Sequence, residues 1–235
     1  MTKFSKKFTV TNNLLTTYDY LKPSAILDFA QEIAGNHADE LGVGFNEFIK
    51  NDLIWIIVRN KVQILKTVKQ IKETKVDSFI TKPRLFELPR DYVFYHNDEE
   101  IIHARSIWVI YNLKEKRVVV PTDYKVLFTE DEGLFPRIKK LPIIQKDNLH
   151  YEKDFVVPYS YLDHNGHMNN THYLDLFLDI FKPQDNEIIK EFQVEYISQC
   201  YLGDTLSLYS YVNENKKYLY GYCKDELKFY LEVIF

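Results

Sequence analysis

The sequence predicts an α+β protein in which antiparallel strands wrap around one long helix, and it predicts this arrangement twice. Aromatic residues make up 15% of the 235 residues, including 18 Tyr and 16 Phe, which favours strands over a helical bundle. Each half contains one segment with helical apolar periodicity followed by a run of strand-like segments. Apolar residues cover much of each helix, so each helix needs a sheet around it.

In the first half, residues 8–18 begin with the β-branched and aromatic residues of a strand. Residues 22–42 predict the helix, with Pro23 near its start and Gly42 or Gly44 at its end. Its apolar face recurs at steps of three and four, through Ile26, Phe29, Ala30, Ile33, Ala34 and His37. Four strand candidates follow at 53–65, 72–82, 84–96 and 99–113, with a hairpin turn at Asn97-Asp98. Pro89 is expected to bend or break the third of them.

The second half repeats this plan. A strand is expected within 153–162, a helix over 169–181 that Pro183 ends, and strands over 188–198, 204–214 and 216–235. The last segment is expected to fold back near Lys224-Asp225. Residues 122–150 contain Gly133, Pro136 and Pro142 and predict an irregular link. The predicted organisation is therefore an N-terminal domain over 1–121, a linker over 122–150 and a C-terminal domain over 151–235.

Composition excludes several classes of protein. The formal net charge is −4, without the clustered basic excess of a nucleic-acid binder. No run reaches the ~18 apolar residues of a membrane span, and no apolar region of a signal peptide follows the basic N-terminus. Cys200 and Cys223 make neither a disulfide framework nor a metal site of familiar spacing. A cytoplasmic protein without a metal is expected.

Polar residues gather in one stretch, YSYLDHNGHMNNTHYLDLFLDIF at 159–181, directly before the second apolar helix. Asp163 and Asn165 can cap the helix, or serve as a base and a hydrogen-bond donor. His167 can move protons near neutral pH, and Gly166 allows a tight turn. Backbone N–H groups at a helix start can hold a developing oxyanion. Since caps need one or two such residues rather than five, the pattern favours a catalytic site.

The segment LDHNGHMNNTHYLD resembles the active-site motif of acyl-ACP thioesterases, which release fatty acids from acyl carrier protein. The first half resembles the same family over LLTTYDYLKPSAILDFAQEIAGNHADELGVG and the tryptophan-bearing LIWIIVRNKVQI. The segment VEYISQCYLGDTLSL is similar to the family's cysteine-bearing region downstream of the motif. The resemblance covers nearly the whole chain. The His-Met-Asn-Asn core alone is shared with other hotdog thioesterases.

This resemblance implies two tandem hotdog domains, one catalytic motif in the second half and an acyl-chain pocket shaped by the first. It implies catalytic roles for Asp163, Asn165 and His167, with Cys200 as a further candidate, and it requires no cofactor. Asp163 is expected to be the base, or alternatively a transient nucleophile. Substrate binding is expected at Trp55, Asn169 and Gln199. Family members often carry glutamate before the cysteine, whereas this chain has Gln199, which excludes a base at that position.

The implied partners are acylated carrier protein and its fatty acyl chain, with a monomer and a homodimer both compatible with the sequence. An acidic carrier would need a basic docking face. The candidate clusters are Lys66, Lys69, Lys72 and Lys75; Lys82, Arg84 and Arg90; and Arg137, Lys139 and Lys140. The alternatives are an acyl-CoA thioesterase, a hotdog dehydratase or hydratase, and a non-enzymatic acyl-thioester sensor.

Overall fold

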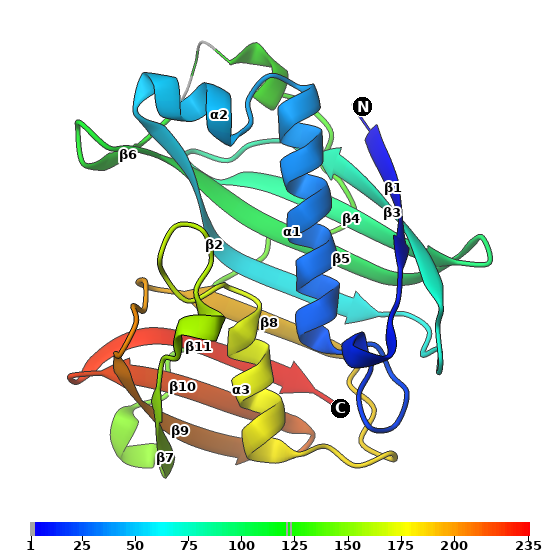
Figure 1. Ribbon diagram of the computed structural model, residues 1–235, viewed down its shortest axis with the longest axis vertical. Coiled ribbons are helices and arrows are strands. Elements are labelled where there is room, and N and C mark those ends of the chain that lie inside the picture. The colour runs from blue at the N-terminus through cyan, green and yellow to red at the C-terminus, as the bar shows by residue number, and fades with distance from the viewer. Residues whose placement is uncertain (1–2, 121, 123) are drawn as a thin grey trace. The chain divides into compact units, whose positions relative to one another are not determined.

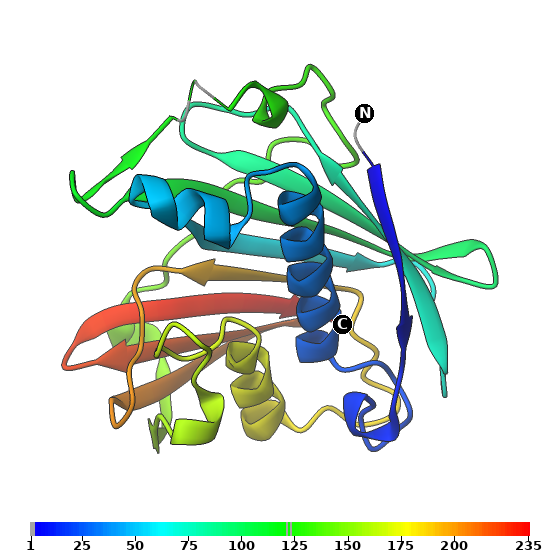
Figure 2. The same ribbon diagram turned by 45° about the horizontal axis from the view of Figure 1, so that its top comes forward.

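The computed structural model describes residues 3–120, 122 and 124–235, and its chain divides into two compact units, Met1–Ile138 and Lys139–Phe235. Each unit contains an antiparallel sheet with a helix across one face, which Figures 1 and 2 show for each unit separately. The predicted α+β plan is confirmed in both halves. The units divide inside the segment 122–150 that the sequence predicts to be irregular.

The N-terminal unit has a sheet in the order β1-β3-β4-β5-β2, with β6 paired to β5. Its strands are β1 (Lys3–Thr9), β2 (Leu53–Ile64), β3 (Glu73–Ile80), β4 (Leu88–His96), β5 (Glu99–Asn112) and β6 (Arg117–Val119). Its helices are α1 (Pro23–Glu40) and the short α2 (Phe45–Phe48), with 3-10 turns η1 (Asn12–Leu14), η2 (Ile49–Asn51) and η3 (Lys125–Leu127). The sequence predicted neither α2 nor β6, and the first strand lies earlier than residues 8–18.

Helix α1 begins and ends where its sequence directs. Lys22 is extended at the N-cap and Pro23 occupies the first helical position, where its missing N–H costs nothing. Gly42, with φ +68°, takes the left-handed conformation just beyond the last turn. The buried face packs on β1 and β3, and Phe29 stacks on Phe8 with ring centroids 4.6 Å apart. The core of the unit therefore lies between this face of α1 and the inner side of the sheet.

Two hairpins form at the predicted dipeptides. Asn97 and Asp98 have φ of 50° and 62° and join β4 to β5. Lys224 and Asp225 have φ of 49° and 66° and join β10 to β11. Two successive positive φ angles match the right-handed twist of the flanking strands. Pro89 is the second residue of β4, so it lies at the start of the strand rather than breaking it.

The C-terminal unit has a sheet in the order β8-β11-β10-β9-β7. Its elements are η4 (Lys146–Asn148), β7 (His150–Val156), η5 (Tyr159–Tyr161), α3 (His172–Phe181), β8 (Glu191–Tyr196), β9 (Thr205–Asn213), β10 (Lys216–Cys223) and β11 (Glu226–Ile234). Tyr173 of α3 packs on Phe229 of β11 and Tyr196 of β8, at 4.5 and 5.6 Å between ring centroids. Helix α3 begins three residues after the predicted start, which leaves the polar motif in the loop before it.

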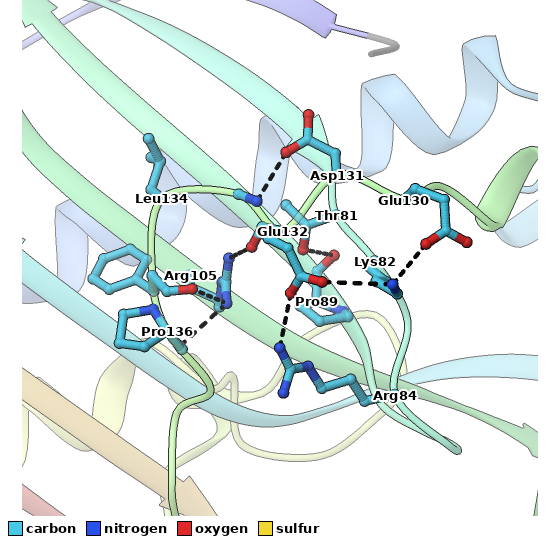
Figure 3. A network of polar contacts seen from close by, with 12 residues as sticks. Thr81, Lys82, Arg84, Pro89, Arg105, Glu130, Asp131, Glu132, Leu134 and Pro136 are labelled. Atoms are coloured by element: carbon cyan, nitrogen blue, oxygen red, sulfur yellow. Dashed lines mark hydrogen bonds and ion pairs between the residues drawn. The ribbon is translucent and has the colours of Figure 1, made fainter.

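A buried ion pair on the outer face of the N-terminal sheet binds the chain segment that covers this face. Arg105 on β5 lies opposite Asp91 on β4 and donates from Nε at 2.5 Å and from Nη2 at 2.8 Å to its two carboxylate oxygens. The same guanidinium donates to the carbonyl oxygens of Glu132 and Phe135, and the N–H of Leu134 donates to Asp91 Oδ2 at 2.6 Å. Figure 3 shows Arg105 reaching the backbone of this segment. One ion pair thus holds the segment 132–136 on the sheet.

The segment that opens the C-terminal unit covers the outer face of the second sheet. That face carries a buried tyrosine cluster, formed by Tyr218, Tyr220, Tyr222 and Tyr230. Three apolar side chains of the segment pack against this cluster: Leu141, Ile144 and Leu149. Tyr230 Oη donates to the carbonyl of Leu141 at 3.1 Å, and the N–H of Ile144 donates to Tyr220 Oη at 3.3 Å. The tyrosine hydroxyls therefore satisfy backbone groups of the covering segment.

The structure corrects one predicted basic cluster. Lys82 pairs with Glu130 at 2.6 Å, and Arg84 pairs with Glu132 at 2.9 Å, as Figure 3 shows. Arg90 is buried and cannot contribute to a docking surface. Because side chains alternate along a strand, Arg90 faces the helix side of the sheet while neighbouring Asp91 faces the outer side.

Among the described helices, none combines the length and apolarity needed to cross a membrane.

We expect Arg105→Met to lower the free energy of unfolding by about 3–5 kcal/mol, because it leaves the Asp91 carboxylate buried without its cation. The matched change Arg84→Met removes an exposed ion pair and should cost about 1 kcal/mol or less. Urea denaturation of both variants measures the difference. Equal losses would mean that the Arg105 pair contributes no more than a surface ion pair.

We expect Gly133→Ala to destabilise the protein by roughly 2 kcal/mol or more, because Gly133 has φ +73° and an added Cβ would lie 2.3 Å from Asp91 Oδ2. Gly35→Ala is the opposite case, since Gly35 lies within α1 with nothing within 4 Å of an added Cβ. That change should stabilise by about 0.5–1 kcal/mol. Thermal unfolding checks both signs, and a stable Gly133→Ala protein would contradict the tight packing of this segment.

Candidate active site

The polar motif forms a small hairpin-like turn before α3. Leu162 and Met168 form an antiparallel bridge that closes it, and the N–H of Asp163 donates to the carbonyl of His167 at 2.9 Å. Gly166 has φ +79° at the tip, where its N–H donates to the carbonyl of Asp163 at 3.0 Å. This left-handed position favours glycine. The turn brings both ends of the Asp-x-Asn-x-His pattern together.

Asp163, Asn165 and His167 meet within this turn. His167 Nδ1 lies 3.5 Å from Asp163 Oδ2, with the two side chains 18% and 13% exposed. The backbone N–H of Asn165 donates to Asp163 Oδ1 at 2.8 Å, and its side-chain Nδ2 lies 3.5 Å from Oδ2. The carboxylate is thus fixed by two neighbours while it remains reachable. An acid–base group that is held but accessible is what proton transfer to or from a substrate requires.

The alternative in which Asp163 and Asn165 cap the helix is wrong. The N-cap of α3 is Thr171, which makes no side-chain cap hydrogen bond, and the Oδ1 of Asn169 accepts from the N–H of Thr171 at 3.1 Å in the turn before the helix. The backbone N–H groups of Met168 and Asn169 donate to the carbonyls of Cys200 and Tyr161. These groups are therefore engaged within the protein.

Cys200 lies behind the motif rather than at its surface. It is fully buried, and its carbonyl holds the N–H of Met168 at 2.8 Å. Burial raises the pKa of the Cys200 thiol, against a smaller opposing effect of the Tyr173 hydroxyl. The pKa of Tyr173 is likewise raised, chiefly by burial and then by Cys200. The thiolate that would act as a nucleophile is disfavoured in this position.

Gln199 and Tyr201 flank the motif on a neighbouring strand-like segment. Tyr201 forms an antiparallel bridge with His167, so their side chains lie on the same face. Tyr201 Oη donates to Gln199 Oε1 at 2.7 Å. This hydrogen bond occupies the carbonyl end of the amide and leaves the NH₂ end as a donor. The sequence did not indicate Tyr201, because its bridge to His167 joins two segments that are far apart in the chain.

Trp55 belongs to the N-terminal unit. Its indole N–H donates to the carbonyl of Val43 at 2.8 Å, and its ring stacks on Phe48 at 5.1 Å between centroids. Trp108 meets it edge-on at 6.3 Å. Trp55 is only partly buried in this aromatic cluster, so one part of the ring remains available for contact.

The fold is shared with solved thioesterase structures. An acyl-ACP thioesterase from Bacteroides thetaiotaomicron aligns with a TM-score of 0.86 at 20% identity, over 99% of this chain and 97% of that one. A 12:0-ACP thioesterase from Umbellularia californica also aligns with a TM-score of 0.86 at 19% identity, over 99% and 96%. At these identities the likeness establishes the double hotdog fold, in agreement with the prediction.

Two family models and several plant proteins match the sequence. A palmitoyl-acyl carrier protein thioesterase of Arabidopsis thaliana is 26% identical over 74% of this chain and 47% of its own length. An oleoyl-acyl carrier protein thioesterase of Coriandrum sativum is 24% identical over 75% and 52%. The chain thus spans about half the length of the curated relatives that it matches. The model of the acyl-ACP thioesterase C-terminal domain matches residues 144–227. Because the model of the N-terminal domain matches residues 1–126, more than half of the sequence, the chain belongs to the acyl-ACP thioesterase family.

Proposed function

We propose that this protein hydrolyses the thioester of fatty acyl–acyl carrier protein, releasing free fatty acid and ending chain synthesis. The observation that carries the proposal is the turn that places His167 Nδ1 3.5 Å from the Asp163 carboxylate at the surface of the C-terminal unit. Family membership supplies the substrate class. A thioester carbonyl is already electrophilic, so a positioned water, a base and an oxyanion donor suffice.

Asp163 acts as the base in this proposal. Its carboxylate takes a proton from water as the water oxygen attacks the thioester carbonyl carbon, and the carbon–sulfur bond then breaks as the leaving thiolate takes this proton from Asp163, which restores the carboxylate. The Nδ1 edge of His167 faces Asp163, so its Nε2 edge points away and can contact the water or the substrate. Asn165 holds the carboxylate through its backbone N–H. No cofactor takes part.

Gln199 binds the thioester carbonyl oxygen. The hydrogen bond from Tyr201 occupies Oε1, so the amide NH₂ is the donor that can stabilise the developing oxyanion. Tyr201 is a positioning residue that acts through Gln199. The side chain of Asn169 contributes a further amide on the helix side of the motif, with its Oδ1 already held by Thr171.

The N-terminal unit shapes the acyl-chain pocket, with Trp55 as one contact. In this proposal the chain consists of one domain over residues 1–121 and another over 151–235, joined by a linker over 122–150.

The alternative function is acyl-CoA hydrolysis on the same fold, which differs only in the carrier of the acyl group. Docking of acidic carrier protein would use the remaining basic clusters around Lys72 and around Arg137 and Lys139.

We expect the purified protein to release thiol from acyl-carrier protein faster than from acyl-CoA of the same chain length. Asp163→Asn and His167→Ala should each lower kcat by about 10²–10⁴-fold, because they remove the proton-handling groups. His164→Ala is the matched control, since His164 lies exposed in the same turn and should keep its activity. Equal rates on both carriers would favour the alternative function, acyl-CoA hydrolysis. Full activity of Asp163→Asn would exclude Asp163 as the base.

We expect Cys200→Ala to keep kcat within about tenfold of the wild type, since the raised pKa keeps the buried thiol protonated and away from the substrate. Alkylation by iodoacetamide at neutral pH should be slow at Cys200 for the same reason. Mass spectrometry follows the modification, and steady-state kinetics follow the variant. Loss of activity comparable to that of Asp163→Asn would instead place Cys200 in the catalytic machinery.

A further inference from the structure

Three side chains meet at the base of the turn that carries Asp163. Tyr161, where the chain enters the turn, stacks on His172, the first residue of α3, with ring centroids 4.2 Å apart and planes inclined by 17°. His172 Nδ1 lies 2.9 Å from Asp175 Oδ2, one helical turn further along. Tyr161, His172 and Asp175 are called the stacked cluster below. The stacked cluster joins the start of the turn to the first turn of the helix that follows it.

Tyr161 makes two further contacts at this base. Its carbonyl accepts from the N–H of Asn169 at 2.9 Å, which joins the residue that enters the turn to the one that leaves it. Phe155 of β7 packs on the Tyr161 ring at 5.5 Å between centroids. The ring is thus in contact with a strand and with a helix, and residues 162–168 extend from it.

The carboxylate of Asp175 is directed at the imidazole. Asp175 is the acidic residue in the first turn of α3, where the helix dipole favours a negative charge wherever the side chain points. It contacts His172 nonetheless, while the N-cap Thr171 makes no side-chain cap hydrogen bond. Burial, then Asp175 and Asp179, raise the pKa of the Tyr161 hydroxyl, in agreement with a carboxylate close to its ring. The first turn of α3 is therefore ordered by the stacked cluster.

The exposure of the stacked cluster argues against a role in fold stability alone. The side chains of His172 and Asp175 are each 29% exposed, and ion pairs that water reaches contribute little to stability. The buried residues of the helix are Tyr173, Leu174, Leu176 and Phe177. These apolar side chains stabilise α3, whereas the stacked cluster determines how the preceding turn joins it.

The two arms of the turn are supported differently. The returning arm carries His167, which pairs with Tyr201 of a neighbouring segment through a backbone bridge. The entering arm carries Asp163, whose N–H donates to the carbonyl of His167 at 2.9 Å. The entering arm begins at Tyr161, so the stacked cluster supports the arm that holds the carboxylate.

We propose that the stacked cluster positions the Asp163 carboxylate for proton transfer. This inference rests on the proposed function, in which Asp163 is the base. The three members are positioning residues, because they act on the substrate only through Asp163. Displacing a catalytic group by about 1 Å costs up to about 10²-fold in rate. A cluster that adds little to stability can therefore have a large effect on kcat.

The first test is steady-state kinetics on acyl-carrier protein. We expect Tyr161→Leu and His172→Ala to lower kcat by about 10–100-fold and to leave KM within about threefold, because the carboxylate is displaced while substrate binding remains. Tyr161→Phe keeps the ring and should keep kcat within about threefold of the wild type. Asp179→Asn, an exposed change one helical turn beyond Asp175, is the matched control and should behave likewise. Wild-type kcat in both Tyr161→Leu and His172→Ala would overturn the proposal.

A double-variant cycle separates positioning from an independent structural role. If the stacked cluster acts through Asp163, adding His172→Ala to Asp163→Asn should lower kcat no further than Asp163→Asn alone. Effects that multiply would overturn the proposal. An inactive Asp163→Asn beside a fully active His172→Ala would exclude the stacked cluster alone. Full activity of Asp163→Asn would exclude the proposed base, and with it any catalytic role of the stacked cluster.

Hydrogen–deuterium exchange tests the positioning without turnover, since the Asp163 N–H is bonded inside the turn and its exchange reports local opening. We expect exchange in residues 162–168 to rise at least about tenfold in His172→Ala and to match the wild type in Asp179→Asn. The unfolding temperature of His172→Ala should stay within about 4 °C of the wild type. Unchanged exchange in the turn would overturn the proposal. A much larger fall in unfolding temperature would show instead that the stacked cluster supports the fold as a whole.

Discussion

The pair between Asp91 and Arg105 is the interaction on which the N-terminal unit depends. A sheet has two faces, and α1 covers only one of them, so the other must be covered by chain without regular structure. Irregular backbone can be buried only where its polar groups find partners. Arg105 donates to three backbone carbonyls of this segment, and Asp91 accepts an N–H from it, so one cross-strand ion pair satisfies polar backbone groups of the chain that covers it. In the C-terminal unit, tyrosine hydroxyls fulfil the same role with neutral groups.

Local chemistry made much of the fold predictable. Pro23 starts α1, and the dipeptides at Asn97 and Lys224 form turns whose φ angles the flanking strands demand. The unpredicted parts depend on contacts distant in sequence. The sequence places Arg90 in one basic cluster with Lys82 and Arg84, because residue types do not show which face of a strand each side chain takes. A strand's period of two sends Arg90 inward and Asp91 outward, and only the register with β5 gives each its environment.

The candidate site was predictable in composition and less so in geometry. The sequence brings Asp163, Asn165 and His167 together by proximity alone, and the turn confirms that they are neighbours. Helix α3 starts later than the apolar pattern indicates because residues 169–171 form a turn in which Asn169 Oδ1 accepts from the N–H of Thr171, the N-cap residue. Tyr201 is brought to His167 by backbone pairing with a segment more than thirty positions away, which no local pattern reveals. The proposed catalytic residues Asp163, Asn165 and His167 are close together in the sequence, whereas Tyr201 lies far from them in the sequence.

The covered outer faces determine where this protein could be divided into fragments. A fragment that ended at residue 121 would lose the segment 132–136 that Arg105 binds. A fragment that began at residue 151 would expose the buried tyrosine cluster to solvent. Such a surface favours aggregation. A cut between Ile138 and Lys139 leaves each half with its own cover. That peptide bond is therefore the place to separate the halves for individual expression, or to split them for a reassembly assay.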